Sequence, residues 1–193
     1  MNENPTNANE QFKLGLCYLN GDDVPQDIKK AVYWIIKAAE QGHVEAQSFS
    51  GDSYREMGNM EKAAYWWAKA AEQGDASSQA NIGICYEFGD GVSRDMGKAV
   101  YWYTKAAEQG DKVAQFNLAV RYKEGVGISK DLEKAAYWWT KSAEQGLADA
   151  QHDIGVCYVN GWGVTMDYGM ARYWLNKSAY QGNQDAKRIL SII

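Results

Sequence analysis

Ala38-Ala39-Glu40-Gln41-Gly42 decides the fold, because the chain repeats this stretch. Variants of it occupy residues 70–74, 106–110, 142–146 and 178–182, so its glycine recurs after 32, 36, 36 and 36 residues. A period of this length is typical of a tandem array, in which each unit packs only against its neighbours. The sequence therefore predicts stacked repeats. It also predicts, as their most general function, an extended surface for binding other molecules.

The composition narrows the class of protein. The 193 residues are 46% hydrophobic and 13% aromatic, which is ample for a buried core. A net charge of -5 and the absence of a basic run argue against a nucleic-acid partner. No apolar stretch approaches the roughly 20 residues of a membrane span, so membrane insertion is not expected. The first residues lack signal-peptide regions, which favours a cytoplasmic location, or a periplasmic or secreted one if an export signal has been removed.

Cysteine positions support the same compartment. Cys17, Cys85 and Cys157 occupy one position in repeats one, three and five. Because packed helices lie about 8 to 10 Å apart, two repeats separate these cysteines by on the order of 20 Å. A disulfide tolerates a Cα separation of only about 7 Å. We expect free thiols, as in a reducing compartment.

Each repeat encodes two helices, as the third repeat shows. Two stripes of helical period occupy it: Ser78, Ile82, Gly83 and Tyr86 in its first half, and Ala99, Trp102, Ala106 and Ala107 in its second half. Small residues in both stripes let the two helices approach closely, while the aromatic residues fill the space beside them. The repeat is predicted to be a helical hairpin.

Polar residues and glycines mark the ends of each second helix. Its N-cap is predicted at Asp27, Asn59, Asp95, Asp131 and Asp167. Its C-terminal stop, in the left-handed conformation, is predicted at Gly42, Gly74, Gly110, Gly146 and Gly182. The two helices are joined by a Gly-x-Gly-aliphatic loop at 89–92, 125–128 and 161–164, whose aliphatic residue is expected to pack under its hairpin.

The pattern A-x-x-x-[LI]-G-x-x-Y, G-x-G-V, D-x-x-K-A-x-x-W and K-A-A-E-Q-G resembles the Sel-one-like repeat family, a branch of the tetratricopeptide-like helical repeats. Five units match, from about residue 10 to residue 182. The resemblance implies an all-α fold, a right-handed α/α superhelix of five helix-turn-helix repeats plus a C-terminal capping helix. It also implies a protein that mediates protein–protein interaction without enzymatic activity.

The repeat pattern predicts the domain organisation. A flexible N-terminus covers residues 1–8, and one repeat domain covers 9–193, with repeats at about 9–44, 45–76, 77–112, 113–148 and 149–184 and a cap at 185–193. Repeat two is four residues short and has Ser50 where the others have Leu or Ile, which is either a neutral deletion or a notch that admits a partner. The cap ends in Ile192 and Ile193, which either fold back onto repeat five or form an end face for self-association.

The first helix of each repeat offers a candidate binding face. A rotation of about 100° per residue identifies the positions that point away from the core stripe, and the resemblance implies that they line a concave groove. The predicted groove residues are Phe12, Leu16, Leu19, Asp52, Arg55, Ile84, Glu87, Phe88, Phe116, Val120, Lys123, His152, Val156, Val159 and Asn160. A peptide or a protein edge is the predicted ligand. For Leu16, Ile84, Val120 and Val156 the alternative is simple packing between adjacent first helices.

Aromatic residues form a second candidate surface. The tyrosines Tyr33, Tyr65, Tyr101, Tyr137 and Tyr173 each precede a signature tryptophan, and they either anchor a partner or, as is commoner for such a column, pack repeat against repeat. Seven of the eight tryptophans fall in second helices and are predicted to be core. Trp162, between two loop glycines, is predicted to be exposed.

No pattern indicates a cofactor, a metal site or catalysis. His43 and His152 are three repeats apart, and the chain lacks C-x-x-C, H-E-x-x-H and phosphate-loop spacings. It also lacks the S-x-x-K, S-D-N and K-T-G motifs that β-lactamase-like chemistry, described for some cysteine-rich relatives, would need. A hydrolase using Cys85 and His152 is a remote hypothesis. We expect a non-catalytic adaptor, with an immunity protein that neutralises a toxin as the alternative.

Overall fold

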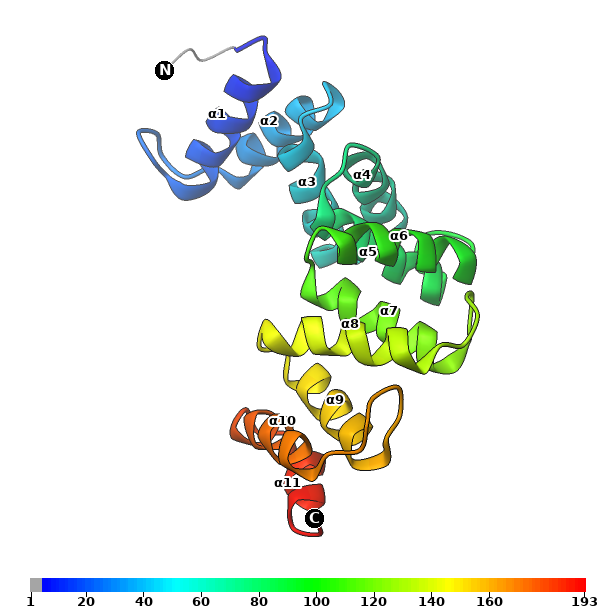
Figure 1. The fold of residues 1–193 in the computed structure, drawn as a ribbon. Helices are drawn as coiled ribbons and strands as arrows, with labels where there is room; N and C mark the ends of the chain where they lie inside the picture. Colours follow the sequence, from blue (N-terminus) through cyan, green and yellow to red (C-terminus); the bar gives the residue numbers. More distant parts are fainter. Residues whose placement is uncertain (1–4) are drawn as a thin grey trace. The chain divides into compact units, whose positions relative to one another are not determined.

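The structure is a computed structural model that describes residues 5–193, and it has the predicted all-α repeat class (Figure 1). Within those residues eleven helices and no strands are present. The helices are α1 (Ala8–Asn20), α2 (Ile28–Glu40), α3 (Val44–Glu56), α4 (Met60–Glu72), α5 (Ala76–Phe88), α6 (Met96–Glu108), α7 (Lys112–Glu124), α8 (Leu132–Glu144), α9 (Ala148–Asn160), α10 (Tyr168–Tyr180) and α11 (Gln184–Leu190).

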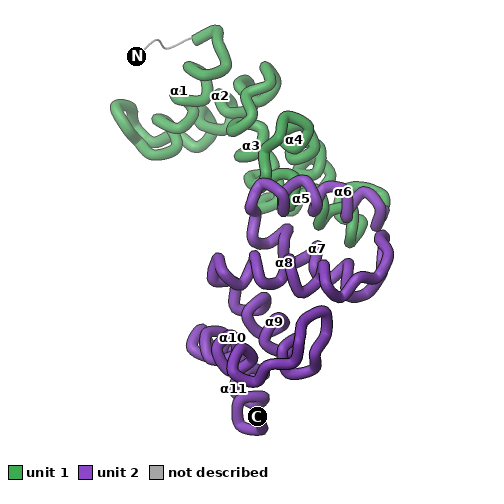
Figure 2. Tube along the Cα trace, viewed as in Figure 1, with its two compact units in different colours: residues 1–94 green, residues 95–193 purple. Residues whose placement is uncertain are grey.

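The chain divides into two compact units, residues 1–94 and 95–193 (Figure 2). In the first unit α1 packs on α2, α2 on α3, α3 on α4 and α4 on α5. In the second unit the same order runs from α6 to α11. Each helix thus packs mainly on its neighbours in sequence, as in a repeat array.

The N-terminal residues fall partly outside the described part of the chain. Of the segment 1–8 that was expected to be flexible, residues 1–4 lie outside it, and α1 begins at Ala8. Pro5 is buried, and its carbonyl oxygen accepts a hydrogen bond from Gln11 Nε2 at 3.0 Å. This contact ties the start of the described chain to α1.

The predicted helix ends are confirmed. Each predicted N-cap side chain accepts a hydrogen bond from a backbone N–H in the first turn of its helix, for example Asp131 Oδ1 from Lys134 N at 3.0 Å. Each predicted stop glycine has a φ between 87° and 100°. In this left-handed region a glycine meets no Cβ penalty, so the helix ends there at little cost.

The core is built from alanine, glycine and tryptophan, as the two stripes predict. The second helices contribute fully buried alanines at one shared position: Ala31, Ala63, Ala99, Ala135 and Ala171. A Cβ on Gly155 would lie 2.7 Å from Leu175 Cγ, so the hairpin of α9 and α10 depends on the missing side chain. Five of the seven second-helix tryptophans are buried and two are half-buried, whereas Trp162 is exposed as predicted.

The Gly-x-Gly-aliphatic loops make a contact that the sequence did not reveal. Each lies against the first turn of the second helix in the preceding repeat, because a Cβ on Gly91 would be 2.1 Å from the carbonyl oxygen of Met60. The corresponding distances are 2.6 Å from Gly127 to Met96 O and 1.9 Å from Gly163 to Leu132 O. The second loop glycine is therefore required by contact between repeats as well as by its positive φ.

Buried glutamines also connect neighbouring repeats. They occupy one position in every first helix, and each is no more than 5% exposed: Gln11, Gln47, Gln79, Gln115 and Gln151. Gln47 Nε2 donates to Ala39 O at 3.0 Å, and Gln47 Oε1 accepts from Gln73 Nε2 at 2.7 Å. Gln73 belongs to the repeated A-E-Q-G stretch, and its Nε2 also donates to Gly42 O of repeat one at 3.1 Å, so the motif that defines the period also bonds one repeat to the next.

The C-terminal cap shows the fold-back alternative for its last residue. Ile193 packs with Ile189 and Leu190 against a buried cluster that includes Leu175, so the last residue folds back onto repeat five. Ile192, by contrast, is exposed. The end of the described chain thus keeps one large apolar side chain in solvent.

Candidate partner-binding surface

In the first unit, the predicted groove residues come from α1, α3 and α5, and their side chains differ in solvent exposure. Phe12 is half-buried against the core and lies beside the His43 ring, with a centroid distance of 4.6 Å. Leu16, Leu19, Asp52, Ile84 and Glu87 are also half-buried. Arg55 is exposed, with Nη2 3.7 Å from Asp52 Oδ1, and Phe88 is 66% exposed.

Phe88 is the most accessible apolar side chain among the predicted groove residues. It is the last residue of α5, where Gly89 caps the helix with a φ of 81°. The Gly89 N–H donates to Cys85 O at 2.8 Å, and Arg94 Nε donates to Glu87 O at 2.9 Å. The backbone under Phe88 is thus held on both sides, so its exposed ring can act as an anchor that loses little entropy on binding.

In the second unit, the predicted residues lie on α7 and α9 and divide in the same way. Phe116 and Val120 pack against the core cluster of that unit, and Val159 packs against the cluster around Leu175. His152 and Val156 are half-buried, and Asn160 is exposed.

Lys123 is the exposed cation of this second group. Its Nζ lies 5.6 Å from the centroid of the Trp139 ring and 6.0 Å from that of Trp162. These distances are within the range of a cation–π contact, which favours a defined position for the ammonium group. A positive charge beside the exposed Trp162 ring offers both polar and apolar contact to a ligand.

The packing alternative accounts for much of the Leu16, Ile84, Val120 and Val156 column. All four are half-buried, and Val120 contacts the core directly. We define the first-helix face as the exposed remainder of the prediction, namely Arg55, Phe88, Lys123 and Asn160 with the half-buried residues beside them. Arg55 and Phe88 belong to the first unit, and Lys123 and Asn160 belong to the second unit, so each unit carries its own part of this face.

His152, a predicted groove residue, has a perturbed proton affinity. Its Nδ1 lies 2.8 Å from Asp153 Oδ1. This hydrogen bond raises the pKa of His152 above 6.5, with the charges of Asp153, Asp185 and Asp149 adding to it and burial opposing it. The protonated ring would present a positive charge on α9.

The pKa of His152 provides a testable prediction. Because the folded pKa is above the unfolded one, protonation stabilises the fold; the stability is fully present below about pH 6.5 and is lost as pH rises through the folded pKa. We expect an NMR titration of the His152 ring to give a midpoint above 6.5, and the Asp153→Asn variant to give a lower one. An unchanged midpoint in that variant would show that the hydrogen bond is not the cause.

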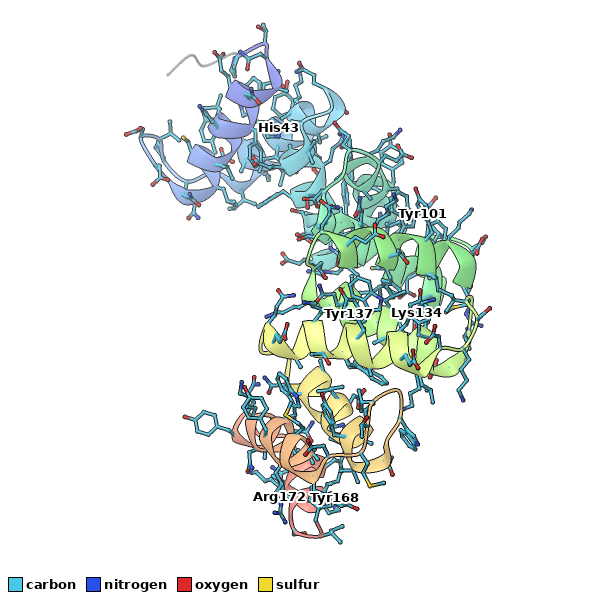
Figure 3. The ribbon with its side chains drawn as sticks, in the orientation of Figure 1. His43, Tyr101, Lys134, Tyr137, Tyr168 and Arg172 are labelled. Carbon is cyan, nitrogen blue, oxygen red and sulfur yellow. The ribbon has the colours of Figure 1, made fainter. Side chains whose placement is uncertain are left out.

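The tyrosine column is exposed to solvent. The five side chains are 48 to 55% exposed. Each ring contacts its adjacent tryptophan edge-on, with centroids 4.9 to 5.0 Å apart. The lysine one turn later lies over the ring, for example Lys141 over Tyr137 at 5.8 Å from the centroid. Figure 3 labels two tyrosines of this column, Tyr101 and Tyr137. These contacts are local, which explains why the rings stay in solvent.

The thiols are poorly suited to nucleophilic catalysis. The three cysteines are free, and Cys85 and Cys157 are buried. Burial raises the pKa of the Cys85 thiol to about 11 and that of Cys157 to about 12, so both are protonated at neutral pH. Within residues 5–193 no group of three or more His, Cys, Asp and Glu side chains is placed to hold a metal ion.

No helix in the described part of the chain combines the length and the apolar character needed to span a membrane.

The fold and these surfaces define an all-α repeat protein of the tetratricopeptide-like class. The sequence matches the Sel1 repeat five times, at residues 11–43, 48–75, 76–111, 112–147 and 148–183, and the chain belongs to this family. Sel1 repeat proteins generally mediate protein–protein interactions and are typically non-catalytic. A search among curated proteins found no significant match.

Solved structures of bacterial proteins share the fold. The chain is 40% identical to c5321, a protective antigen of uropathogenic Escherichia coli, with a TM-score of 0.85; the match covers 93% of this chain and 39% of that protein. It is 34% identical to a Sel1 repeat protein from Oxalobacter formigenes, with a TM-score of 0.83 and coverage of 96% and 75%. The immunity protein PA5088 from Pseudomonas aeruginosa is 22% identical, with a TM-score of 0.53 and coverage of 95% and 69%.

Proposed function

We propose that the protein is a non-catalytic adaptor that holds a segment of a partner protein on its first-helix face. The exposed Phe88 ring on an anchored helix end is the single observation that carries this proposal. Buried glutamines and caps fix the helices around it, so the face is formed before the partner arrives. In the first unit Arg55 supplies an exposed charge on this face, and in the second unit Lys123 does so.

Charge and apolar content indicate the kind of segment that would bind. Apolar anchors and charges of both signs alternate on the face, with Asp52 and Arg55 on α3 and Glu87 and Phe88 on α5. An extended peptide or the edge of a folded domain satisfies such a mixed surface, whereas nucleic acid requires a uniformly positive one. Protein is therefore the proposed ligand class.

Affinity purification from the native host tests this proposal. We expect the wild-type chain to retain a partner that Phe88→Ala loses, because an exposed aromatic anchor contributes about 2 kcal/mol or more at an interface. For the purified partner this corresponds to a Kd at least about 30-fold weaker, since about 1.4 kcal/mol is a factor of ten. Calorimetry on the purified pair would measure this change.

Tyr180→Ala is the matched control, because Tyr180 is an aromatic residue on a second helix and is 95% exposed. The control variant is expected to retain the partner with unchanged affinity. Partners that are captured equally by wild type, Phe88→Ala and Tyr180→Ala would contradict the proposal.

An immunity role is the second candidate, and the structural likeness to PA5088 motivates it, although at 22% identity that likeness concerns the fold alone. An inhibitor should bind one folded enzyme with nanomolar Kd, whereas an adaptor should bind short peptides with micromolar Kd, a difference of about 4 kcal/mol. The calorimetry above separates the two roles. Retention of nanomolar affinity only by an intact folded enzyme would favour inhibition.

A further inference from the structure

Repeat two leaves a surface uncovered that the other repeats cover. In repeats three, four and five, a Gly-x-Gly-aliphatic loop lies on the first turn of the preceding second helix, and the first residues of those helices, Met60, Met96 and Leu132, are half-buried. Repeat two has no such loop, because Met57 and Gly58 lead directly from α3 to the N-cap of α4. The equivalent residue of α2, Ile28, is 52% exposed.

Two observations show that the missing loop causes this exposure. Among the described residues, no Gly-x-Gly-aliphatic loop follows α10, and Tyr168, the first residue of α10, is also 52% exposed. A Cβ on Gly58 would meet nothing within 4 Å, whereas a Cβ on Gly91 would meet the carbonyl oxygen of Met60 at 2.1 Å. The short connection in repeat two therefore makes no equivalent contact with repeat one.

An apolar pocket lies one turn further along α2. It has a volume of about 70 Å³ and is lined by Val32, Ile35, Ile36, Phe49, Ser50, Ser53, Tyr54 and Met57. Ser50 replaces the larger Leu or Ile of the other repeats, and its hydroxyl already donates to Ala46 O at 2.7 Å. Ser53 likewise donates to Phe49 O at 2.9 Å, so the walls present mainly apolar groups. Pockets that bind small molecules have volumes of about 300 to 1,000 Å³. This pocket is much smaller, and its volume fits a single side chain.

In three places the structure shows a Gly-x-Gly-aliphatic loop covering the first turn of a second helix. At each covered site, a glycine with φ between 69° and 76° contacts the carbonyl of the first helical residue, and a half-buried Val or Ile follows it. We propose that the first turn of α2 and the adjacent pocket are a docking site for a Gly-x-Gly-aliphatic turn of a partner protein. The inference rests on the proposed binding function and names the element that the partner supplies.

A second copy of this chain does not supply that element. The loop of repeat one, residues 21–24, has Asp23 as its third residue, with φ 60°. The Cβ of Asp23 would meet the α2 carbonyl, because in the three covered sites a Cβ at this position falls 1.9 to 2.6 Å from the oxygen. The other three loops already cover sites in their own chain. A different protein is therefore the partner.

A loop graft tests whether the site accepts this element. In the grafted variant, residues 57–58 are replaced by the sequence of residues 89–94, which restores the missing loop to repeat two and leaves Arg55 in place. We expect hydroxyl-radical labelling of Ile28 to fall in the folded variant while labelling of Tyr168, the matched uncovered position, stays at its wild-type rate. In the grafted variant the loop is part of the same chain, so its effective concentration at the site is high. Binding would therefore be detected even if the loop has only a weak affinity for the site. Unchanged labelling of Ile28 would overturn the proposal.

A peptide tests binding from a separate molecule. The probe is the octapeptide EFGDGVSR, cyclised head to tail to hold the turn, and its control is EFGDAVSR, in which the second glycine is alanine. We expect saturable shifts of the Ile28 and Ile36 methyl resonances with the first peptide only, and none in the grafted variant. Equal shifts with both peptides, or no shift with either, would contradict the docking site.

Different results would refute the adaptor function and the docking site at α2. The Phe88→Ala variant should bind the cyclic peptide as the wild type does, because Phe88 does not line the pocket. If the grafted variant captures the cellular partner as well as the wild type does, this docking site is refuted while the adaptor function stands. If neither chain captures any partner, the adaptor function fails, and the labelling and peptide results still decide whether the site accepts the turn.

Discussion

Replacing Gly163 by alanine is expected to destabilise the second unit by about 3 kcal/mol. Gly163 has φ 69°, and a Cβ would lie 1.9 Å from the carbonyl oxygen of Leu132. A left-handed conformation costs a side-chain-bearing residue about 1 to 2 kcal/mol, and overpacking adds about 1 to 3 kcal/mol. Both contacting groups are backbone, so neither can move without separating the loop from α8. Denaturant unfolding, followed by tryptophan fluorescence, would measure the loss.

Gly110→Ala is the control for this prediction. Gly110 has φ 95°, yet a Cβ there meets nothing within 4 Å. Alanine at position 110 is therefore destabilised only by the left-handed backbone conformation. We expect the free energy of unfolding to fall by about 1 kcal/mol. Equal losses in the two variants would show that the loop contact between repeats contributes no stability.

Replacing Gln115 by methionine, which has a similar shape without the amide, is expected to destabilise the fold by about 2 kcal/mol. Gln115 is 4% exposed; its Nε2 donates to Ala107 O at 3.1 Å, and its Oε1 accepts from Gln145 Nε2 at 2.9 Å. Methionine removes both hydrogen bonds and leaves buried polar groups with fewer partners. The measurement is again the free energy of unfolding.

Gln145→Met supplies the comparison, because Gln145 is exposed and water can replace its partners. We expect a loss of about 0.5 to 1 kcal/mol for this variant. The double variant should lose less than the sum of the two single losses, since the pair shares one hydrogen bond. Strict additivity would show that the hydrogen bond between Gln115 and Gln145 contributes no stability.

Helices and their ends could be predicted from the sequence because their signals are local. The N-cap Asp131 bonds to a backbone N–H three residues away, and Gly146 ends the same helix through its own φ. The glutamine network was missed because its members, such as Gln115 and Gln145, are 30 residues apart. A signal was present, since glutamine occupies the same position in all five first helices.

The candidate site could be predicted only in part, because burial depends on neighbouring repeats. Rotation around a single helix correctly placed Phe88 and Lys123 in solvent. The same argument also selected Phe116 and Val120, which contact the core, since it ignores what the adjacent helices cover. The loop aliphatic residues were expected only under their own hairpins, and nothing in one repeat shows that its loop also covers the previous one.

Site-specific photo-cross-linking in the native host tests the central claim most directly. A photoreactive phenylalanine analogue would replace Phe88 or Arg55 on the first-helix face of the first unit, or Tyr180 on a second helix. The account predicts that one protein cross-links at positions 88 and 55 and is absent at position 180. Cross-linking of that protein at position 180 alone would contradict it.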